Sequence, residues 1–301
     1  MFTLVTIVIL CYFLVVIFVF FYQRNLLYHP FENNYSSDEA SFEYEEVFVP
    51  TSEGKELKAW LHKKDLREKK TLLFFHGNAG NLSNRVYKLN RFNELDLNIL
   101  IISWRSFSGN RGEPTEFNLY EDARKAVKWL NDKGVSSENI ILYGESLGTG
   151  VAVEIAQSNK FNSIILESPY TSMEKAAKIY YPYLPIKFLL KDKYNSEKKI
   201  QNINIPILIM HGKKDQIIPF QMGKKLFETA NLPKEFLPID DDDHMLTFND
   251  KLLLEIKKFI KKNLKLKYGF NHRYHGSIKL AKKIIDEKKK STTDSEFESS
   301  D

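Results

Sequence analysis

The chain has 301 residues, of which 43% are hydrophobic, 13% aromatic and 28% charged, as in a folded globular protein. The formal net charge is only +5, and no nucleic-acid motif accompanies the basic residues, so we expect no nucleic-acid partner. The one cysteine, Cys11, excludes disulfides within the chain and cysteine-based metal sites.

The N-terminus is an apolar run from Phe2 to Tyr22, in which only Thr3 and Thr6 are clearly polar. As a helix it spans about 31 Å, close to the hydrocarbon thickness of a bilayer. A cleaved signal peptide is the alternative, but no Lys or Arg precedes the run and bulky residues follow it. We therefore expect residues 1–23 to be an uncleaved transmembrane anchor that contacts the membrane through residues 2–22.

Few charges decide the orientation of this anchor. Arg24 flanks the apolar run, and the next basic residue is Lys55. The acidic residues between them count little for topology, so Arg24 alone favours a cytoplasmic domain and leaves the side of the membrane open. Residues 24–42 are predicted to be a polar connector.

From Glu43 onward, strands alternate with helices. The segments YEEVFVP and ELKAWLHK alternate apolar and polar residues, which is typical of a half-exposed hairpin. Later strands are continuous apolar runs, as in a parallel sheet buried on both faces. Repeated strand–helix units predict an α/β fold with a doubly wound, mostly parallel sheet in residues 43–264. The predicted buried strands are Thr71–Gly77, Asn98–Trp104, Asn139–Glu145, Asn162–Ser168 and Ile205–Gly212, and the predicted helices are Leu82–Leu95, Thr115–Lys133, Leu147–Asn159, Phe220–Ala230 and Asn249–Leu264.

Two segments fall outside this alternation. Residues 169–204 separate two strands by far more than an ordinary loop and are rich in aromatic residues, which predicts a short helical lid. Residues 265–301 lose the apolar pattern, which predicts a basic, largely disordered tail. Within the tail, SIKLAKKIIDEKKK would present apolar residues on one helical face and lysines elsewhere, a pattern of helices on anionic membranes; a solvated segment is the simpler interpretation.

The strongest motif is ILYGESLGTG, a Gly-x-Ser-x-Gly sequence between a buried strand and a helix. This context is typical of a nucleophile elbow, a tight turn that projects the serine hydroxyl above the sheet. Side chains at Gly144 and Gly148 would collide with the neighbouring strand or helix. Ser146 is therefore the candidate nucleophile, and a serine that only caps the helix is the alternative.

A serine nucleophile needs a base, and the base needs a carboxylate that orients it. In this kind of fold the chain order is serine, acid, histidine. Asp215 follows the last clearly buried strand and is the only carboxylate in its loop, although it could simply cap the next helix. Of the later histidines, His244 follows the predicted strand EFLPI and precedes a helix, whereas His272 and His275 lie in the tail.

Acyl transfer also requires an oxyanion hole made of two N–H groups. One is expected from Leu147, directly after the nucleophile, and the other from Asn78 in the glycine-containing loop FFHGNAGN. That loop is not a phosphate loop, because no Gly-Lys-Ser/Thr follows it. We expect no cofactor.

Six segments in chain order resemble the α/β-hydrolase superfamily: HGNAGN, RGEPTEFNLYEDARKAVKWL, YGESLGTGVAVEIA, the segment from SPYTSMEK to NSEKKI, PILIMHGKKDQIIP and DDDDH. They are similar in particular to its membrane-anchored, bud-emergence-type subgroup, related to protein-depalmitoylating hydrolases. The resemblance implies a Ser146–Asp215–His244 triad, which chain order reached independently, and hydrolysis of acyl esters or thioesters in small-molecule, lipid-like or acylated substrates. The chain departs from the family pattern at Ser106, where a glycine is usual, and at Asp240–Asp243, where small residues are usual.

The leading interpretation is therefore a membrane-anchored serine hydrolase that forms an acyl-enzyme. The alternative is a non-catalytic, membrane-anchored binding module on a hydrolase fold, since a fold alone does not prove activity. The connector leaves little room for the substrate-selecting domain that a peptidase of this fold would add. Lid residues are predicted to line an acyl pocket, with packing on the sheet as the equal alternative: Tyr170, Met173, Tyr180, Tyr181, Leu184 and Phe188.

The run Asp240–Asp243 directly precedes His244. Adjacent carboxylates rarely converge on a cation without a glycine to turn the chain, so we expect no metal site. Negative charge near an imidazole favours its protonated form. Replacing Asp241 to Asp243 with Ser or Gly is therefore predicted to move the acidic limb of activity to lower pH.

Overall fold

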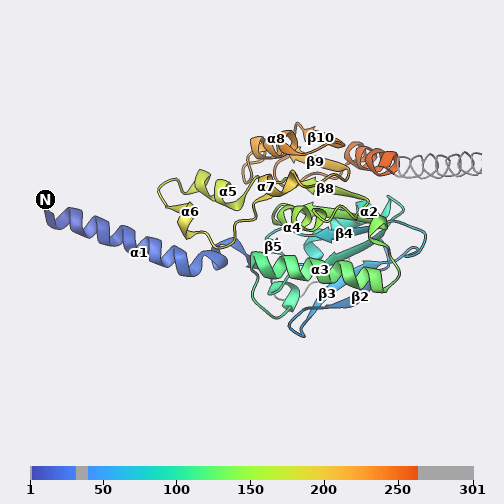
Figure 1. The fold of residues 1–301 in the computed structure, drawn as a ribbon, viewed down its shortest axis with the longest axis horizontal. Helices are drawn as coiled ribbons and strands as arrows, with labels where there is room; N and C mark the ends of the chain where they lie inside the picture. The colour runs from blue at the N-terminus through green and yellow to red at the C-terminus, as the bar shows by residue number, and fades with distance from the viewer. Residues whose placement is uncertain (1, 32–39, 264–301) are drawn as a thin grey trace, which may run out of the picture. The chain divides into compact units, whose positions relative to one another are not determined.

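The computed structural model describes residues 2–31 and 40–263. The chain divides into two units, Met1–Leu253 and Leu254–Asp301. The first unit contains the sheet and the helices that cover it (Figure 1). The predicted tail, 265–301, and the segment within it considered as an amphipathic helix lie outside the described residues.

An eight-stranded sheet has the strand order β10-β9-β8-β7-β4-β6-β3-β2. The neighbours β2–β3 and β3–β6 are antiparallel, and all other neighbours are parallel. The five parallel strands from β9 to β6 are buried along their whole length, while the edge strand β2 alternates between buried and exposed. The predicted mostly parallel sheet is confirmed. Its strands are β2 (Glu45–Pro50), β3 (Glu56–His62), β4 (Thr71–Phe75), β6 (Asn98–Ile102), β7 (Ile140–Glu145), β8 (Ser163–Glu167), β9 (Ile207–Gly212) and β10 (Lys234–Ile239).

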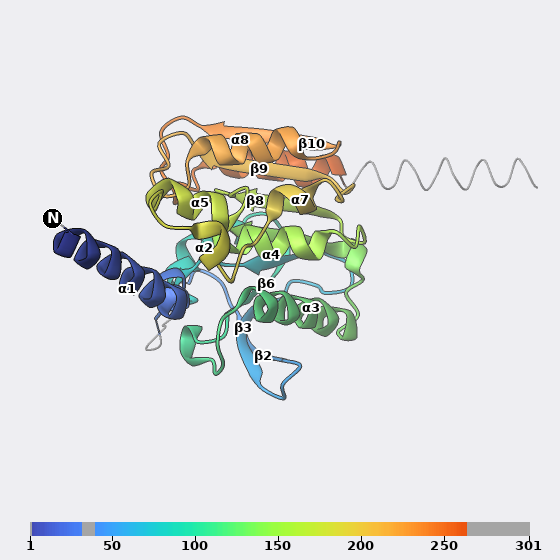
Figure 2. The ribbon, with the colours of Figure 1, turned by 60° about the vertical axis from the view of Figure 1, so that its left-hand side comes forward.

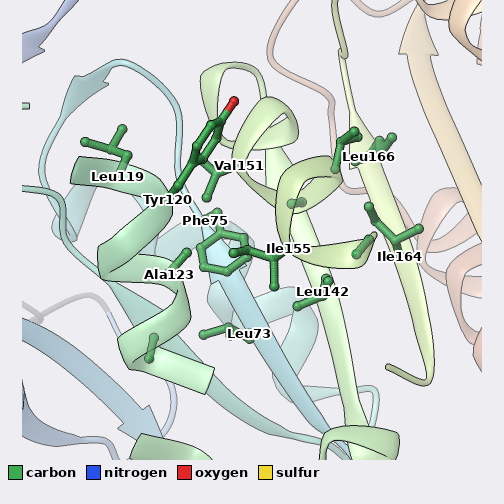
Figure 3. Close-up of a cluster of buried hydrophobic side chains, with 14 of the residues drawn as sticks. Leu73, Phe75, Leu119, Tyr120, Ala123, Leu142, Val151, Ile155, Ile164 and Leu166 are labelled. Carbon is green, nitrogen blue, oxygen red and sulfur yellow. The ribbon is translucent and has the colours of Figure 1, made fainter. Parts of the chain in front are cut away.

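Helices cover both faces of this sheet, as a doubly wound fold requires (Figure 2). On one face, α3 (Glu116–Asp132) and α4 (Leu147–Ala156) direct apolar side chains onto β4, β7 and β8 (Figure 3). On the other, Phe92 of α2 (Val86–Asn93) lies 6.1 Å from Phe74 and 5.0 Å from Tyr143, ring centre to ring centre. Phe74 and its neighbour Phe75 therefore face opposite layers, because strand side chains alternate.

The remaining elements are short. A helical lid follows β8, and α8 packs on β9 and β10. A two-stranded parallel pair joins the segment after α1 to the loop after β4. The lid helices are α5 (Met173–Tyr180), α6 (Ile186–Leu189) and α7 (Ser196–Ile200); the pair is β1 (His29–Pro30) and β5 (Ala79–Gly80); α8 is Phe220–Thr229; the 3-10 helices are η1 (Ser83–Arg85), η2 (Phe107–Gly109) and η3 (Ser137–Asn139); and a last helix covers 250–263.

The N-terminal helix α1 (Phe2–Leu27) contains the predicted apolar run Phe2–Tyr22. Its segment Thr3–Leu27 is long and apolar enough to cross a membrane, and its apolar side chains are exposed rather than buried in the protein core. A signal sequence near an N-terminus satisfies the same criteria of length and composition.

Candidate active site

Ser146 occupies a sharp turn between the end of β7 and the start of α4. Its backbone angles are φ 49° and ψ −114°, a conformation that non-glycine residues rarely adopt. A Cβ added at Gly144 would lie 2.6 Å from Thr149 Cα, and one at Gly148 would lie 2.0 Å from the carbonyl oxygen of Phe75. The predicted collisions at both glycines are confirmed, so the turn depends on their missing side chains.

The structure brings the three predicted residues of the triad together. His244 Nε2 lies 2.9 Å from Ser146 Oγ, and His244 Nδ1 lies 2.8 Å from Asp215 Oδ2. The three residues follow β7, β9 and β10, whose carboxyl ends meet at one edge of the parallel sheet. An ionised Asp215 can only accept from Nδ1–H, so Nε2 is left to accept the hydroxyl proton of Ser146.

The carboxylate of Asp215 is saturated with donors. Oδ1 accepts the backbone N–H groups of Ile217 and Ile218 at 2.9 and 2.8 Å, and Oδ2 lies 3.0 Å from His211 Nε2 as well as close to His244. Burial by itself raises the pKa of Asp215, but the hydrogen bonds from His211 and His244 outweigh it and hold the pKa well below its usual value. The group is therefore ionised throughout the neutral range.

His211 is a partner of the acid that its sequence position did not reveal. Its Nε2 also lies 2.9 Å from the carbonyl oxygen of Ile218. A carbonyl only accepts, so Nε2 carries the proton and donates it also toward Asp215. Its Nδ1 is buried with no hydrogen-bond partner in the described part of the chain. The sign of this contact in the sequence is that His211 lies only four residues before Asp215.

The predicted oxyanion loop lies against the nucleophile. A Cβ added at Gly77 would lie 3.5 Å from Ser146 Cβ. The loop is held from the other side by Asn78, whose side chain donates to the carbonyl of Leu27 and whose own carbonyl accepts the His29 N–H, both at 2.8 Å. Within the residues that the structure describes, the backbone N–H groups of Asn78 and Leu147 donate to no other group.

A buried ion cluster lies beneath this loop, and no sequence motif announced it. Glu145, directly before the nucleophile, accepts from Arg85 Nη2 at 2.7 Å and from Lys88 Nζ at 2.6 Å. Lys88 also contacts Glu167 at 2.7 Å, and the hydroxyl of Tyr143 donates to the same carboxylate. Glu145 accepts the Gly77 N–H at 3.1 Å, so the cluster joins the nucleophile strand to the oxyanion loop.

The ionisation of this cluster follows from its pairing. Burial opposes a charged Glu145, but Arg85 and Lys88 outweigh it and hold its pKa well below the usual value. Burial likewise opposes a charged Lys88, but Glu145 and Glu167 raise its pKa. The pKa of Glu167 is raised, chiefly by its burial.

The run Asp240–Asp243 is a structured loop rather than a free acidic segment. Asp240 pairs with Lys213 at 2.5 Å and Asp241 with Lys214 at 2.8 Å. The next carboxylate, of Asp242, accepts the Thr247 N–H at 2.7 Å. Asp243 accepts the backbone N–H of His244 at 2.7 Å and that of Gln216, in the acid loop, at 3.0 Å. The four carboxylates thus bond to different partners instead of converging.

These partners sharpen the pH prediction. Asp243→Asn keeps an oxygen that accepts both N–H groups and removes one negative charge next to His244, so the acidic limb of kcat/KM is expected to move to lower pH. Asp241→Asn should move it less, because that carboxylate is exposed and paired with Lys214. The measurement is the pH dependence of kcat/KM for both variants. An acidic limb of kcat/KM at the same pH in Asp243→Asn and in wild type would contradict the prediction.

The other departure from the family pattern, Ser106, keeps a glycine-like backbone. Its φ is 67°, in the left-handed region that favours glycine. The Ser106 hydroxyl donates to the carbonyl of Gly112 at 2.7 Å, which helps to hold a serine in this conformation.

The six residues predicted to line an acyl pocket do not share one surface. Tyr170 is fully buried, and its hydroxyl donates to the Leu147 carbonyl at 3.1 Å. Leu184 is buried in a small cluster within the lid, whereas Phe188 is 84% exposed. Met173 packs against the main core, and Tyr180 and Tyr181 are about half exposed.

Comparison with known proteins places the chain in a family. The model of the prolyl oligopeptidase family matches residues 110–266. Alpha/beta hydrolase domain-containing protein 17B of Homo sapiens is 31% identical over 217 residues, which cover 71% of this chain and 74% of that protein. Protein bem46 of Schizosaccharomyces pombe is 30% identical over 217 residues, 67% of this chain and 73% of that protein.

A solved structure agrees with the fold. The Pyrococcus furiosus esterase Pf2001 superposes with a TM-score of 0.65 at 20% identity and covers 79% of this chain and 98% of that chain. The strand order, the turn at Ser146 and the similarity to the family model and to protein 17B lead to one conclusion: the chain belongs to the α/β-hydrolase family.

Proposed function

We propose that this hydrolase is a membrane-anchored serine hydrolase that cleaves an acyl ester or thioester. The observation that carries the proposal is the continuous line of hydrogen-bond distances from Ser146 through His244 to Asp215. Each side chain stands in the order and geometry that a serine nucleophile, its base and its orienting acid require. The donors around Asp215 keep it charged, as its role demands.

The proposed reaction has two halves. In the first, Ser146 Oγ attacks the acyl carbonyl carbon while His244 Nε2 takes the hydroxyl proton, and the N–H groups of Asn78 and Leu147 bind the oxyanion. His244 then gives this proton to the leaving alcohol or thiol, and an acyl-enzyme forms. In the second half, water attacks the acyl carbon while His244 takes a proton from the water. The bond between this carbon and Ser146 Oγ then breaks, His244 returns the proton to Oγ, and the carboxylic acid leaves. Asp215 holds the imidazole and stabilises its charged form.

Anchoring through α1 is part of the proposal. The C-terminal end of α1 is fastened to the lid by polar groups: Gln23 Nε2 donates to the Leu189 carbonyl at 3.0 Å, and Arg24 pairs with Asp192 at 3.0 Å. The Tyr28 hydroxyl, just beyond α1, lies 2.8 Å from that of Tyr194. A removable signal sequence does not need such contacts, so they favour an anchor that stays. A lipid-like or acylated substrate is consistent with this location.

Covalent labelling by a fluorophosphonate probe tests the proposed nucleophile. The probe reacts with a serine that a base activates, so we expect wild type to be labelled at Ser146 and Ser146→Ala to remain unlabelled. Ser158→Ala, which lies just beyond the opposite end of α4, is the matched control and should be labelled like wild type. Folded wild-type protein that stays unlabelled, or equal labelling of Ser146→Ala, would instead favour the non-catalytic binding module.

A further inference from the structure

The lid carries a surface of unusual composition. Between Glu174 and Asp192 the chain contains no acidic residue. Besides Tyr180, whose hydroxyl contacts the loop after Asp215, four apolar or aromatic side chains of this stretch are exposed: Ile179 by 50%, Tyr181 by 48%, Tyr183 by 64% and Phe188 by 84%. Exposed lysines accompany them at Lys178, Lys187 and Lys191. We call the four apolar residues and the three lysines the lid face.

The lid lies alongside the apolar run of α1 and not only at its end. Val16 and Val19 pack on a cluster formed by Leu184, Ile186 and Leu189. Farther along the helix, the Tyr12 hydroxyl donates to the Tyr183 carbonyl at 3.0 Å. Tyr12 is about 18 Å along the helix from Arg24, well inside the run predicted to enter the bilayer. A membrane that accommodates α1 therefore also meets the lid.

The chemistry of the lid face fits an anionic bilayer surface. Aromatic residues are enriched at the boundary between hydrocarbon and headgroups, and basic residues beside them attract anionic lipids. The side chain of Lys191 already lies 4.3 Å from the centre of the Phe20 ring of α1, so cationic and apolar groups of lid and anchor are interleaved. An acidic residue would be repelled at such a boundary, and this stretch of the lid has none.

The lid is also tied to the catalytic machinery. The hydroxyl of Tyr180 contacts the carbonyl oxygens of Gln216 and Ile217 at 2.6 and 2.7 Å. These two residues directly follow Asp215. One side of α5 therefore rests on the acid loop, while exposed neighbours of Tyr180 belong to the lid face.

We propose that the lid face docks into the membrane leaflet on the side of the hydrolase domain. The site then takes acyl chains from the membrane rather than from solution. This inference rests on the proposed anchoring through α1. The occupant is the lipid surface itself, with anionic headgroups against Lys178, Lys187 and Lys191 and hydrocarbon against the four apolar side chains. Phe188 is then a lipid contact instead of part of an acyl pocket.

A fluorescence experiment on the full chain tests the docking directly. Cys11→Ser removes the native thiol, and an environment-sensitive NBD label is attached at Phe188→Cys or, as the matched control, at Leu232→Cys, which is 77% exposed at the amino end of β10. In proteoliposomes of phosphatidylcholine and phosphatidylserine, we expect nitroxide lipids to quench the label at position 188 several-fold more than the label at 232. Equal quenching overturns the proposal, and so does energy transfer between labels at 188 on two copies without lipid quenching, which would assign the face to a second copy.

Activity provides a second readout. Tyr183→Asp should lower the rate on a long-chain acyl substrate embedded in vesicles by roughly tenfold, because docking strength scales with buried apolar area, while hydrolysis of soluble p-nitrophenyl acetate stays unchanged. Leu232→Asp should change neither rate. Equal rates of Tyr183→Asp and wild type on the embedded substrate would overturn the docking.

Failure of docking and failure of the proposed function give different results. If alkaline carbonate extracts the protein from the vesicles, α1 does not anchor it in the membrane, and the proposed docking is overturned as well. A chain that shows quenching at position 188 but hydrolyses neither substrate keeps the docking and overturns the proposed reaction.

Discussion

Replacing Asp215 with Asn is expected to lower kcat by about 10⁴-fold while the protein remains folded. The reason is the identity of the atom that faces His244. In wild type, Asp215 Oδ2 accepts from His244 Nδ1 at 2.8 Å. With the amide oxygen retained at the Oδ1 position, where two backbone N–H groups require an acceptor, the Asn NH₂ group faces the imidazole. It donates to Nδ1, which moves the ring proton to Nε2, and Nε2 can then no longer accept from Ser146.

The second histidine on the carboxylate makes this substitution harder to accommodate. His211 Nε2 carries a proton, because it also donates to the Ile218 carbonyl, and it lies 3.0 Å from Asp215 Oδ2. An Asn NH₂ group at the Oδ2 position would face the N–H of His211, which is also a donor. Turning the amide relieves this contact but sets its NH₂ against the N–H groups of Ile217 and Ile218. No orientation of Asn satisfies all four neighbours, whereas a carboxylate does.

The measurement is kcat and KM on a p-nitrophenyl ester, with near-ultraviolet circular dichroism to verify the fold. The loss should appear in kcat, since Asp215 acts on the proton transfer and not on substrate binding. Asp132→Asn is the matched control: its carboxylate is exposed on α3 and pairs only with Lys128 among the described residues. A folded Asp215→Asn enzyme within tenfold of wild-type kcat would remove Asp215 from the proposed triad.

The strands and the residues of the proposed triad could be predicted because their signals are local. A parallel strand buried on both faces is a continuous apolar run, and Gly144 and Gly148 mark the turn at Ser146 by the side chains they lack. The chain order serine, acid, histidine then left Asp215 as the candidate acid and His244 as the candidate base. The meeting of Ser146, Asp215 and His244 follows from the rule that parallel strands end at the same edge.

What the sequence could not reveal depends on distant pairs. Lys88 stands in a helix pattern where a lysine normally faces solvent, and only the fold shows it fully buried between Glu145 and Glu167. The lysine partners of Asp240 and Asp241 could not be predicted, because Lys213 and Lys214 follow a different strand. The sequence shows that the lid is rich in aromatic residues but not which way each side chain points. Tyr170 and Phe188 therefore looked alike, although one is buried and the other is 84% exposed.

Lys88→Met is expected to lower the free energy of unfolding by about 3–5 kcal/mol. Methionine keeps the length and apolar stem of lysine, so packing against Phe74 and Phe248, whose rings lie 5.7 and 5.0 Å from Nζ, is largely retained. The cation is lost, however, and Glu145 and Glu167 remain, at 2% and 0% exposure. A charge that loses its buried partner is strongly destabilising, whereas an exposed pair contributes little. Lys128→Met, which breaks only an exposed pair with Asp132, should cost less than about 1 kcal/mol.

The pH dependence of this deficit distinguishes a lost charge from lost packing. In wild type the pKa of Glu145 is depressed, so its contribution to stability is present above the unfolded-state pKa of about 4.3 and is lost as pH falls through the lower folded-state value. Without Lys88, no cation of residues 2–31 and 40–263 is paired with Glu167, and its already raised pKa rises further. A raised carboxyl pKa costs stability at neutral pH and not below the unfolded-state pKa, so the deficit should be larger at pH 7.5 than at pH 5.

Urea unfolding in detergent at these two pH values gives the comparison, and Lys88→Met/Glu167→Gln completes it. The glutamine removes the charge that has lost its partner and still offers an oxygen to the Tyr143 hydroxyl, so the double variant should recover part of the stability at pH 7.5. A deficit that is equal at both pH values, and that Glu167→Gln does not reduce, would mean that Lys88 acts by filling space. The charge of Lys88 would then not be what keeps Glu145 in place, where it accepts the Gly77 N–H beside Ser146.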